Sequence, residues 1–404
     1  MSRKPVGSRF AGDRFNLLVV AWSLFALWVV ARYGIRLGFL LYAEVGLGMD
    51  TNIVDRDFAN YWVGGRLVLE GNYSLLFHPD AYYAHLQSLF GPGYQIHAWS
   101  YPPHFLPLVA PLGYLEYRPA LVVFLAATFA MFVWAAWQFM KHYAADSSKG
   151  LVALALAGYV FMQIEATQNG FLSGALVLAA FAYMRERPMV AGLCLALLTV
   201  KPQLGFLIPL FALLDRNWKL LGWASVFTLA LIASSVAIFG ADVWRDYFEQ
   251  IIPYQKYVMT DWSGIFLRMM PSTFGSLRSL DYTPQLAFLV QSVVSALAFA
   301  AMLRLLFVLR DPLERVFALL VGTFLITPYA FNYDLGAVSV GAACLAVRAR
   351  DGDRPVAMWI YAAIAVLPAA MTPLGINGLP ISPLILAAGL VALWAGARRP
   401  TSIS

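Results

Sequence analysis

Long apolar runs follow one another along the chain, and only short polar or basic connections separate them. The runs 119–140, 219–239 and 284–309 are about as long as an α-helix must be to cross a bilayer. Hydrophobic residues make up 61% of the chain and charged residues 12%, against roughly 45–50% and about 25% in soluble globular proteins. This polar fraction is too small to cover a water-soluble body of 404 residues. We therefore expect an all-α polytopic membrane protein.

The apolar runs differ in length. The clear candidates for membrane-spanning helices are 15–41, 119–140, 219–239, 284–309, 356–371 and 380–397. Shorter runs cover 150–166, 170–184, 189–200, 203–214, 313–327 and 334–347. Together they predict a bundle of about 11–13 transmembrane helices. Polar breaks such as Gln168-Asn169-Gly170 and Lys201-Pro202-Gln203 separate the shorter runs. Irregular backbone at membrane depth is tolerated where protein buries it or where it lines a watery cavity, so these breaks indicate a cavity.

The net charge of +6 is modest and no basic run occurs, so the sequence does not indicate nucleic-acid binding. The basic residues instead lie in short connections, as cytoplasmic loops require. These are the N-terminal Arg3, Lys4, Arg9 and Arg14, then Lys141/Lys149, Arg185/Arg187, Arg216/Lys219, Arg304/Arg310/Arg315, Arg348/Arg350/Arg354 and Arg398/Arg399. The run after Arg14 lacks a small-residue cleavage site, so we interpret it as an uncleaved first helix.

We interpret residues 1–404 as one integral membrane domain. Its orientation assigns each loop to the cytoplasmic or the extracytoplasmic side. Because 1–14 and 141–149 share a face, residues 44–118 become one long extracytoplasmic loop with interfacial helices. The stretch 101–115 carries Pro102, Pro103, Pro107 and Pro111, which favours a broken helix over a span. A second extracytoplasmic loop covers 240–282. If 102–116 crossed the membrane instead, several later features would change face.

Asp57 is the first candidate for a chemical role. It opens a stretch whose apolar residues at 58, 61, 62, 67 and 69 have helical spacing, so it lies near the start of an interfacial helix. One interpretation is a first-turn acid that stabilises the helix. The other is a carboxylate base at the membrane surface. Asp55 and Asp57 could also hold a divalent cation, although two carboxylates are a weak signal.

Further polar residues fall inside apolar runs, where ionisable side chains are costly and are therefore functional candidates. Lys201 is either a snorkelling lysine or a cation held for an anionic group such as phosphate. Arg32 and Arg36 share one face of the first helix, where snorkelling is the simpler interpretation. Tyr333 and Asp334 follow a helix break after Pro328.

The histidines and cysteines indicate no metal centre. His78, His85, His97 and His104 have spacings that match no standard metal motif. We expect hydrogen-bonded loop histidines, with His104 the one that faces the cavity. Both cysteines, Cys194 and Cys344, lie in apolar segments as small core residues. We expect no metal and no cofactor.

Several motifs together resemble glycosyltransferase family 87, membrane enzymes of the GT-C class. They are Asp57-Phe58-x-x-Tyr61-Trp62 with Gly71-x-Tyr73, Tyr101-Pro102-Pro103-x-Phe105, Gln168-Asn169-Gly170, Lys201-Pro202-Gln203 and Pro328-Tyr329…Tyr333-Asp334. The likeness runs from about residue 15 to 345. It implies a GT-C-like bundle, a polyprenyl-phosphate-sugar donor and an acid in the first outer loop as catalytic base, which here falls on Asp57. Some members have a histidine near position 329, where this chain has Tyr329.

The resemblance also implies a multi-pass protein of the cell membrane, the bacterial inner membrane, with its active site on the extracytoplasmic side. Its best-understood relatives transfer mannose, so the sugar is expected to be a hexose, and the acceptor a lipid or glycan. Transfer would be a single displacement with inversion, in which Asp57 takes the acceptor's proton. Lys201, Arg32 and Arg36 would hold the donor phosphate. The residues expected to bind substrate are Tyr61, His104, Gln168, Asn169, Gln203, Tyr333 and Asp334.

Two other functions would use similar features. A lipid or sugar transporter would use the same cavity without chemistry, but it predicts inverted repeats and polar residues on both faces, and the polarity here is one-sided. An outer-face polysaccharide polymerase or ligase would favour arginine-rich outer loops, whereas the outer arginines here are scattered.

Overall fold

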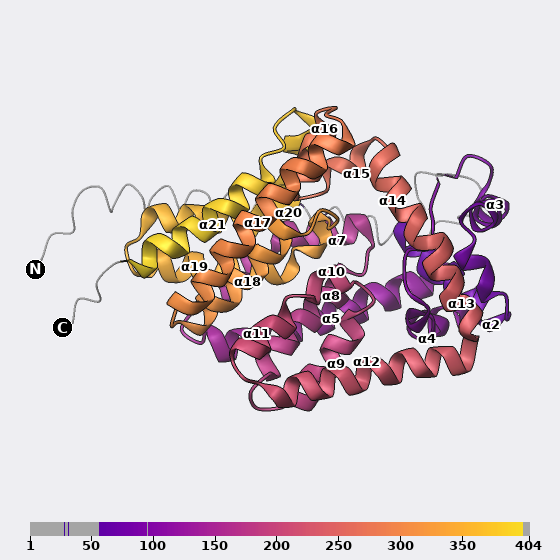
Figure 1. Cartoon of the computed structure of the whole chain (residues 1–404), viewed down its shortest axis with the longest axis horizontal. Coiled ribbons are helices and arrows are strands. Elements are labelled where there is room, and N and C mark those ends of the chain that lie inside the picture. Colours follow the sequence, from indigo (N-terminus) through magenta and orange to yellow (C-terminus); the bar gives the residue numbers. More distant parts are fainter. Residues whose placement is uncertain (1–27, 29–30, 32–55, 95, 399–404) are drawn as a thin grey trace, which may run out of the picture.

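A computed structural model describes Trp28, Ala31 and residues 56–94 and 96–398, and every regular element among them is helical (Figure 1). This confirms the expected all-α polytopic membrane protein. Four of the described helices are long and apolar enough to cross a membrane: α5 (Tyr117–Tyr143), α12 (Trp218–Phe239), α17 (Pro284–Val308) and α20 (Pro355–Ile376). Each of them covers a run that the sequence analysis expected to span. The run 15–41 lies outside the described residues, apart from Trp28 and Ala31.

The shorter apolar runs form shorter helices. The bent pair α6 (Lys149–Ala155) and α7 (Ala157–Ala166) would be a fifth span if counted as one. The others are α8 (Gly170–Tyr183), α9 (Pro188–Leu198), α10 (Pro202–Gly205), α11 (Ile208–Leu214), α18 (Pro312–Ile326) and α19 (Gly336–Asp351). The run 380–397, expected to be a clear spanning helix, forms α21 (Ser382–Ala397), which at 16 residues is shorter than expected and is not one of the four long apolar helices. At 1.5 Å per residue, α8 is about 21 Å long and α9 about 16 Å, well short of the roughly 30 Å hydrocarbon core. Much of the predicted bundle therefore consists of helices that turn back before crossing.

Local sequence explains where several helices begin. Pro284, Pro312 and Pro355 stand in the first turn of α17, α18 and α20, where a missing backbone N–H costs nothing. At the start of α18, the side chain of Asp311 accepts a hydrogen bond from Glu314 N at 3.0 Å.

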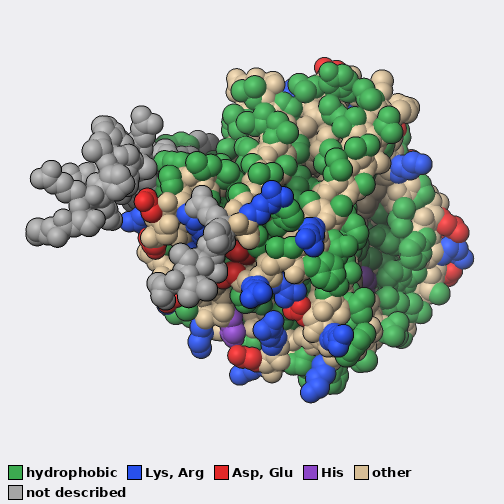
Figure 2. All heavy atoms as spheres, turned by 60° about the vertical axis from the view of Figure 1, so that its left-hand side comes forward, with side chains coloured by type: hydrophobic (Ala, Val, Ile, Leu, Met, Phe, Trp, Pro, Cys, Tyr) green, Lys and Arg blue, Asp and Glu red, His purple; other side chains and the backbone are tan. Residues whose placement is uncertain are grey.

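One end of the molecule collects the basic connections. Arg315 lies 2.6 Å from Asp215, and Arg185 lies 3.6 Å from the same carboxylate. Arg348 pairs with Asp311 at 2.8 Å and also donates to the Tyr143 carbonyl oxygen. The connections after α5, α8, α11 and α19 thus meet, and Figure 2 shows Lys and Arg side chains gathered there. We call this the basic end.

The opposite end, at the right of Figure 1, carries the first predicted outer loop and the start of the second as short helical pieces, and the second loop continues to α15 and α16 at the top of the view. The first loop forms α2 (Arg56–Leu69), η1 (Tyr73–Phe77), α3 (Pro79–Phe90), η2 (Pro103–Phe105), α4 (Leu106–Val109) and η3 (Ala110–Tyr114). The second forms α13 (Ala241–Asp246), η4 (Tyr247–Ile251), α14 (Ile252–Asp261), α15 (Ile265–Arg268) and α16 (Thr273–Ser279). The proline-rich stretch 103–114 consists of pieces of three, four and five residues, so it is broken as expected and is too short to span.

Two large hydrophobic cores, and a small cluster between α15, α16 and α17, hold these parts together. The larger core lies within the bundle and is centred on α8, α18 and α19. The second lies in the first loop and is rich in aromatic side chains, among them Phe58, Tyr61, Tyr82 and Trp99. The aromatic core lets a segment with few long helices pack as a rigid cap beside the bundle.

Candidate functional site

Three helix turns that carry polar residues meet where the two cores adjoin. They are the turn between α7 and α8, the turn between α9 and α10, and the segment between α18 and α19, which includes η5 (Asn332–Asp334). α8, α9 and α10 are too short to cross, and each of the three turns carries buried residues, so it ends within the protein. The buried polar residues Gln168, Lys201 and Asp334 lie on these three turns. The polar breaks expected from the sequence are thus brought together.

Lys201 and Asp334 form a buried ion pair. Lys201 Nζ lies 2.6 Å from Asp334 Oδ1, and the Asp334 side chain is 0% exposed. The second carboxylate oxygen accepts a hydrogen bond from Phe331 N at 3.2 Å, and the ammonium lies 4.8 Å from the centre of the Tyr333 ring. A buried charge requires a partner of this kind because desolvation is costly. Lys201 is therefore an internal cation and does not snorkel. We expected Lys201 to bind the donor's phosphate and Asp334 to bind its sugar, whereas in the structure the two side chains contact each other.

Gln168 joins this layer to the first loop. Tyr61 donates a hydrogen bond to Gln168 Oε1 at 2.5 Å, and the hydroxyls of Tyr61 and Tyr101 lie 2.7 Å apart. Tyr101 also donates to Gln168 Oε1 at 3.2 Å. Burial raises the pKa of both tyrosines well above its ordinary value, so both hydroxyls stay protonated as donors. Tyr101 entered the sequence analysis only as part of the Tyr-Pro-Pro motif, and the structure adds it to the site.

Asn169 lies in the same turn with an unusual environment. Its side chain is buried, and neither Oδ1 nor Nδ2 has a hydrogen-bond partner among the described residues. Gln163 Oε1 and Thr167 Oγ1 nearby are also buried and have no hydrogen-bond partner among the described residues. The next residue is Gly170, where an added Cβ would collide with the Tyr333 carbonyl oxygen. Unpartnered polar atoms are rare in protein interiors, so this turn has unused capacity to hydrogen-bond water or a polar ligand.

Asp57 stands in the first turn of α2, four residues before Tyr61 and therefore on the same helix face. Its side chain is 29% exposed, and His97 Nε2 lies 3.5 Å from Asp57 Oδ1. Burial has the largest effect on the pKa of Tyr101, and the hydrogen bond with Tyr61 has the next largest. The negative charges of Asp57 and Asp334 follow, and both raise this pKa. Both carboxylates thus act on the same tyrosine, although Asp57 is partly open to solvent and Asp334 is enclosed.

His104 is buried but is not part of this polar layer. Its Nε2 lies 3.0 Å from Thr199 Oγ1, and its ring stacks on Trp244 of α13 at 5.7 Å between centroids. Its Nδ1 has no partner among the described residues. Burial lowers the pKa of His104 from 6.5 to about 4, so the imidazole is neutral at pH 7. His104 links the two outer loops to the turn that carries Lys201.

The remaining candidates have simpler placements. Gln203 is partly buried in α10, and its carbonyl oxygen accepts a hydrogen bond from Thr327 at 3.5 Å. Arg32, Arg36 and Asp55 lie outside the described residues. Among the residues that the structure does describe, no group of three or more His, Cys, Asp or Glu side chains could hold a metal ion.

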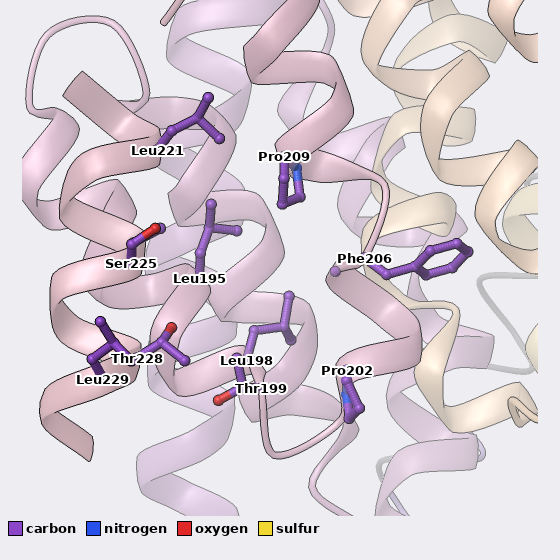
Figure 3. A pocket seen from close by; sticks show the side chains of 12 residues that line it. Leu195, Leu198, Thr199, Pro202, Phe206, Pro209, Leu221, Ser225, Thr228 and Leu229 are labelled. Atoms are coloured by element: carbon purple, nitrogen blue, oxygen red, sulfur yellow. The ribbon is translucent and has the colours of Figure 1, made fainter. Parts of the chain in front are cut away.

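An apolar groove of about 450 Å³ opens beside the turn that carries Lys201 (Figure 3). We call it the α9–α12 groove. Its lining residues are Leu195, Leu198, Thr199, Pro202, Gly205, Phe206, Pro209, Leu221, Ala224, Ser225, Thr228 and Leu229. Thr199 and Pro202 stand on either side of Val200 and Lys201 in the chain, so the groove and the buried ion pair share one turn.

Comparison with known proteins identifies the family. The model of glycosyltransferase family 87 matches residues 99–328, more than half of the chain. The matched range contains Tyr101, Gln168 and Lys201, but it begins after Asp57 and ends before Asp334. No curated protein and no solved structure matches the chain. Given the family match and the helical membrane bundle, the chain belongs to glycosyltransferase family 87 and is a membrane glycosyltransferase.

Proposed function

We propose that this enzyme transfers a hexose, mannose by the resemblance stated above, from a polyprenyl-phosphate-sugar to a lipid or glycan acceptor, with Asp57 as catalytic base. One observation carries the choice of Asp57. Of the two carboxylates that act on Tyr101, Asp334 is enclosed and bound to Lys201, whereas Asp57 is partly exposed. A base must reach the acceptor hydroxyl, and only Asp57 of this pair is open enough to do so.

The reaction would be a single displacement. The acceptor oxygen forms a bond to the sugar C1 while the bond from C1 to the phosphate oxygen breaks. Asp57 takes the acceptor's proton, and the electron pair leaves with the lipid phosphate. The leaving phosphate is already an anion and needs a cation rather than a general acid. Configuration at C1 is inverted because attack and departure occur on opposite faces.

His97 would orient the base. Its imidazole lies within 3.5 Å of Asp57 and contacts the ring of Tyr94 at 5.7 Å. Tyr94 is itself buried and stacks on Phe90 at 4.9 Å. The histidine is thus held by the aromatic core of the first loop. A fixed imidazole N–H beside the carboxylate would keep its other oxygen turned toward the acceptor.

Lys201 would contact the donor phosphate. An ammonium group has three N–H donors, and Asp334 Oδ1 accepts one of them. The others remain available for phosphate oxygens, with Asp334 holding the side chain in place. Arg32 and Arg36 would add positive charge to the same region. Gln168, Asn169 and Tyr333 would form hydrogen bonds with the sugar, and the unpartnered amide of Asn169 supports that role.

We further propose that the site faces the extracytoplasmic side of a bacterial inner membrane. The basic connections gather at one end of the bundle, and α2, α3 and α13 lie at the other (Figure 1). Loops rich in Lys and Arg stay in the cytoplasm. Nucleotide sugars do not reach the opposite side, so an enzyme there needs its sugar delivered on a lipid.

A product assay tests the proposal. Purified protein is incubated with polyprenyl-phosphate-mannose and a membrane lipid extract, and products are identified by mass spectrometry. We expect a product heavier than its acceptor by one hexose, made by the wild type and not by Asp57→Asn. Hexose transfer by a correctly folded Asp57→Asn variant would reject Asp57 as the base. No product from any polyprenyl-phosphate-sugar would reject the donor class.

A further inference from the structure

The α9–α12 groove has the character of a lipid site. Its walls come from α9, from α10 and the start of α11, and from α12, and most of its lining side chains are apolar. The volume of about 450 Å³ falls within the range of ligand pockets. Figure 3 shows Thr199 and Pro202 at one end of the groove and Leu221 and Pro209 at the other. The groove is therefore elongated along the helices.

The groove is open toward the surrounding membrane. α12 forms its outer wall, and only 6% of an apolar stretch of 18 residues in this helix is buried inside the protein. Leu229, which lines the groove, is 66% exposed. At Gly192, an added Cβ would come within 2.6 Å of Trp223 Cβ, so α9 and α12 touch there. An apolar chain in the bilayer could thus enter from the side without passing through water.

One end of the groove lies beside the proposed phosphate-binding residue. Thr199 lines the groove, Pro202 lines it as well, and Lys201 stands between them in the chain. Asp57, in contrast, belongs to α2 in the aromatic core of the first loop. A ligand with a phosphate at Lys201 and an apolar chain in the groove matches this arrangement.

We propose that the α9–α12 groove binds the isoprenoid chain of the lipid-phosphate-sugar donor. This inference rests on the proposed function, because it assigns a place to the chain of the proposed donor. Each part of the isoprenoid chain that is buried in the groove adds hydrophobic stabilisation in proportion to the apolar area removed from contact with water. The groove therefore adds affinity for long-chain donors over donors with short chains, and it fixes the direction from which the phosphate arrives.

The test fills the groove with a large side chain. Thr228 lines it, while Val226 on the same helix does not and is 55% exposed. Thr228→Trp and Val226→Trp thus place an indole on different faces of α12. For each variant, kcat and KM are measured with a mannose donor of full polyprenyl length and with one of two isoprene units. We expect Thr228→Trp to lower the preference for the long donor about tenfold, equivalent to about 1.4 kcal/mol. The loss should arise through KM, and Val226→Trp should keep the wild-type preference.

The outcomes separate this inference from the proposed function. If the wild type uses no polyprenyl-phosphate-sugar, the proposed function fails. If the wild type is active and Thr228→Trp behaves as Val226→Trp does, the groove is not the donor's chain site. A rise in the acceptor's KM alone would assign the groove to the acceptor and overturn the inference. Ser225→Trp, which also fills the groove, replaces Thr228→Trp if that variant does not purify as a folded protein.

Discussion

Lys201 and Asp334 are 133 residues apart in the chain, yet Lys201 Nζ lies 2.6 Å from Asp334 Oδ1 in the interior of the protein. The pair joins the turn after α9 to the turn before α19. Two charges at this depth are tolerated because each compensates the other and a hydrogen bond from Phe331 N satisfies the second carboxylate oxygen. The contact is thus both a structural link between two hairpins and the proposed support of the phosphate-binding ammonium.

Breaking this pair should destabilise the protein. In Lys201→Met the Asp334 carboxylate would stay buried without its partner, and such losses typically amount to about 3–5 kcal/mol. We expect a clear drop in the midpoint of thermal unfolding, measured in one detergent at one protein concentration. Lys201→Met with Asp334→Leu removes both charges and should recover much of the lost stability. If the double variant regains stability but not hexose transfer, Lys201 acts on substrate. If the double variant is fully active, Lys201 has no part in the mechanism.

Asp57→Asn should lower kcat by about 10²–10⁴, the usual contribution of a general base. The amide has nearly the same shape, so the unfolding midpoint should change little. Asp80→Asn is the matched control, because Asp80 is also a first-turn acid in the first loop, at the start of α3. Both variants are assayed with the same donor and acceptor. Equal losses in the two variants would assign Asp57 the simpler role of stabilising its helix.

His97→Ala should lower kcat at least about tenfold while leaving the KM values of both substrates nearly unchanged. The imidazole lies 3.5 Å from Asp57 Oδ1, where a small shift lets it donate to the carboxylate, and a hydrogen bond to a charged group is worth about 1.5–3 kcal/mol. His97→Gln keeps an N–H donor and should regain much of the rate. His85→Ala in α3 serves as the control histidine. If the glutamine variant is as slow as the alanine variant, hydrogen bonding by His97 does not orient the base.

The buried imidazole of His104 predicts a dependence of stability on pH. Its pKa in the folded protein is about 4, below the roughly 6.5 of an unfolded chain. Between these values the unfolded state binds more protons, so stability is full above about pH 6.5 and falls as the pH drops toward 4. The slope from this group is at most about 1.4 kcal/mol per pH unit.

Thermal unfolding of the wild type and of His104→Gln, followed from pH 7 to pH 5, measures this effect. The wild type should lose stability more steeply on acidification, because glutamine does not titrate. His85→Gln provides the matched control, because His85 lies in α3 of the same loop and its side chain is only partly buried. Parallel curves for the wild type and His104→Gln would show that His104 titrates normally and is not held neutral.

Much of the fold followed from the sequence, for a direct physical reason. In lipid, long apolar runs must form helices to satisfy their own backbone hydrogen bonds, so composition and run length predicted the helical bundle and the long spans α5, α12, α17 and α20. The prolines at 102–111 likewise predicted the broken stretch at 103–114. The polar breaks at Gln168, Lys201 and Asp334 were visible as interruptions of this pattern, and the family motifs marked the same positions.

Only the tertiary structure decided which of these residues meet. A run of 11 or 14 apolar residues does not reveal whether it continues or turns back, because that depends on the neighbour that buries its turn. The pairing of Lys201 with Asp334, the tyrosines on Gln168 and the approach of His97 to Asp57 all join segments that are distant in sequence. The α9–α12 groove likewise exists only once three helices pack without filling the space between them. Periodicity describes one element at a time, whereas these features arise from the packing of several.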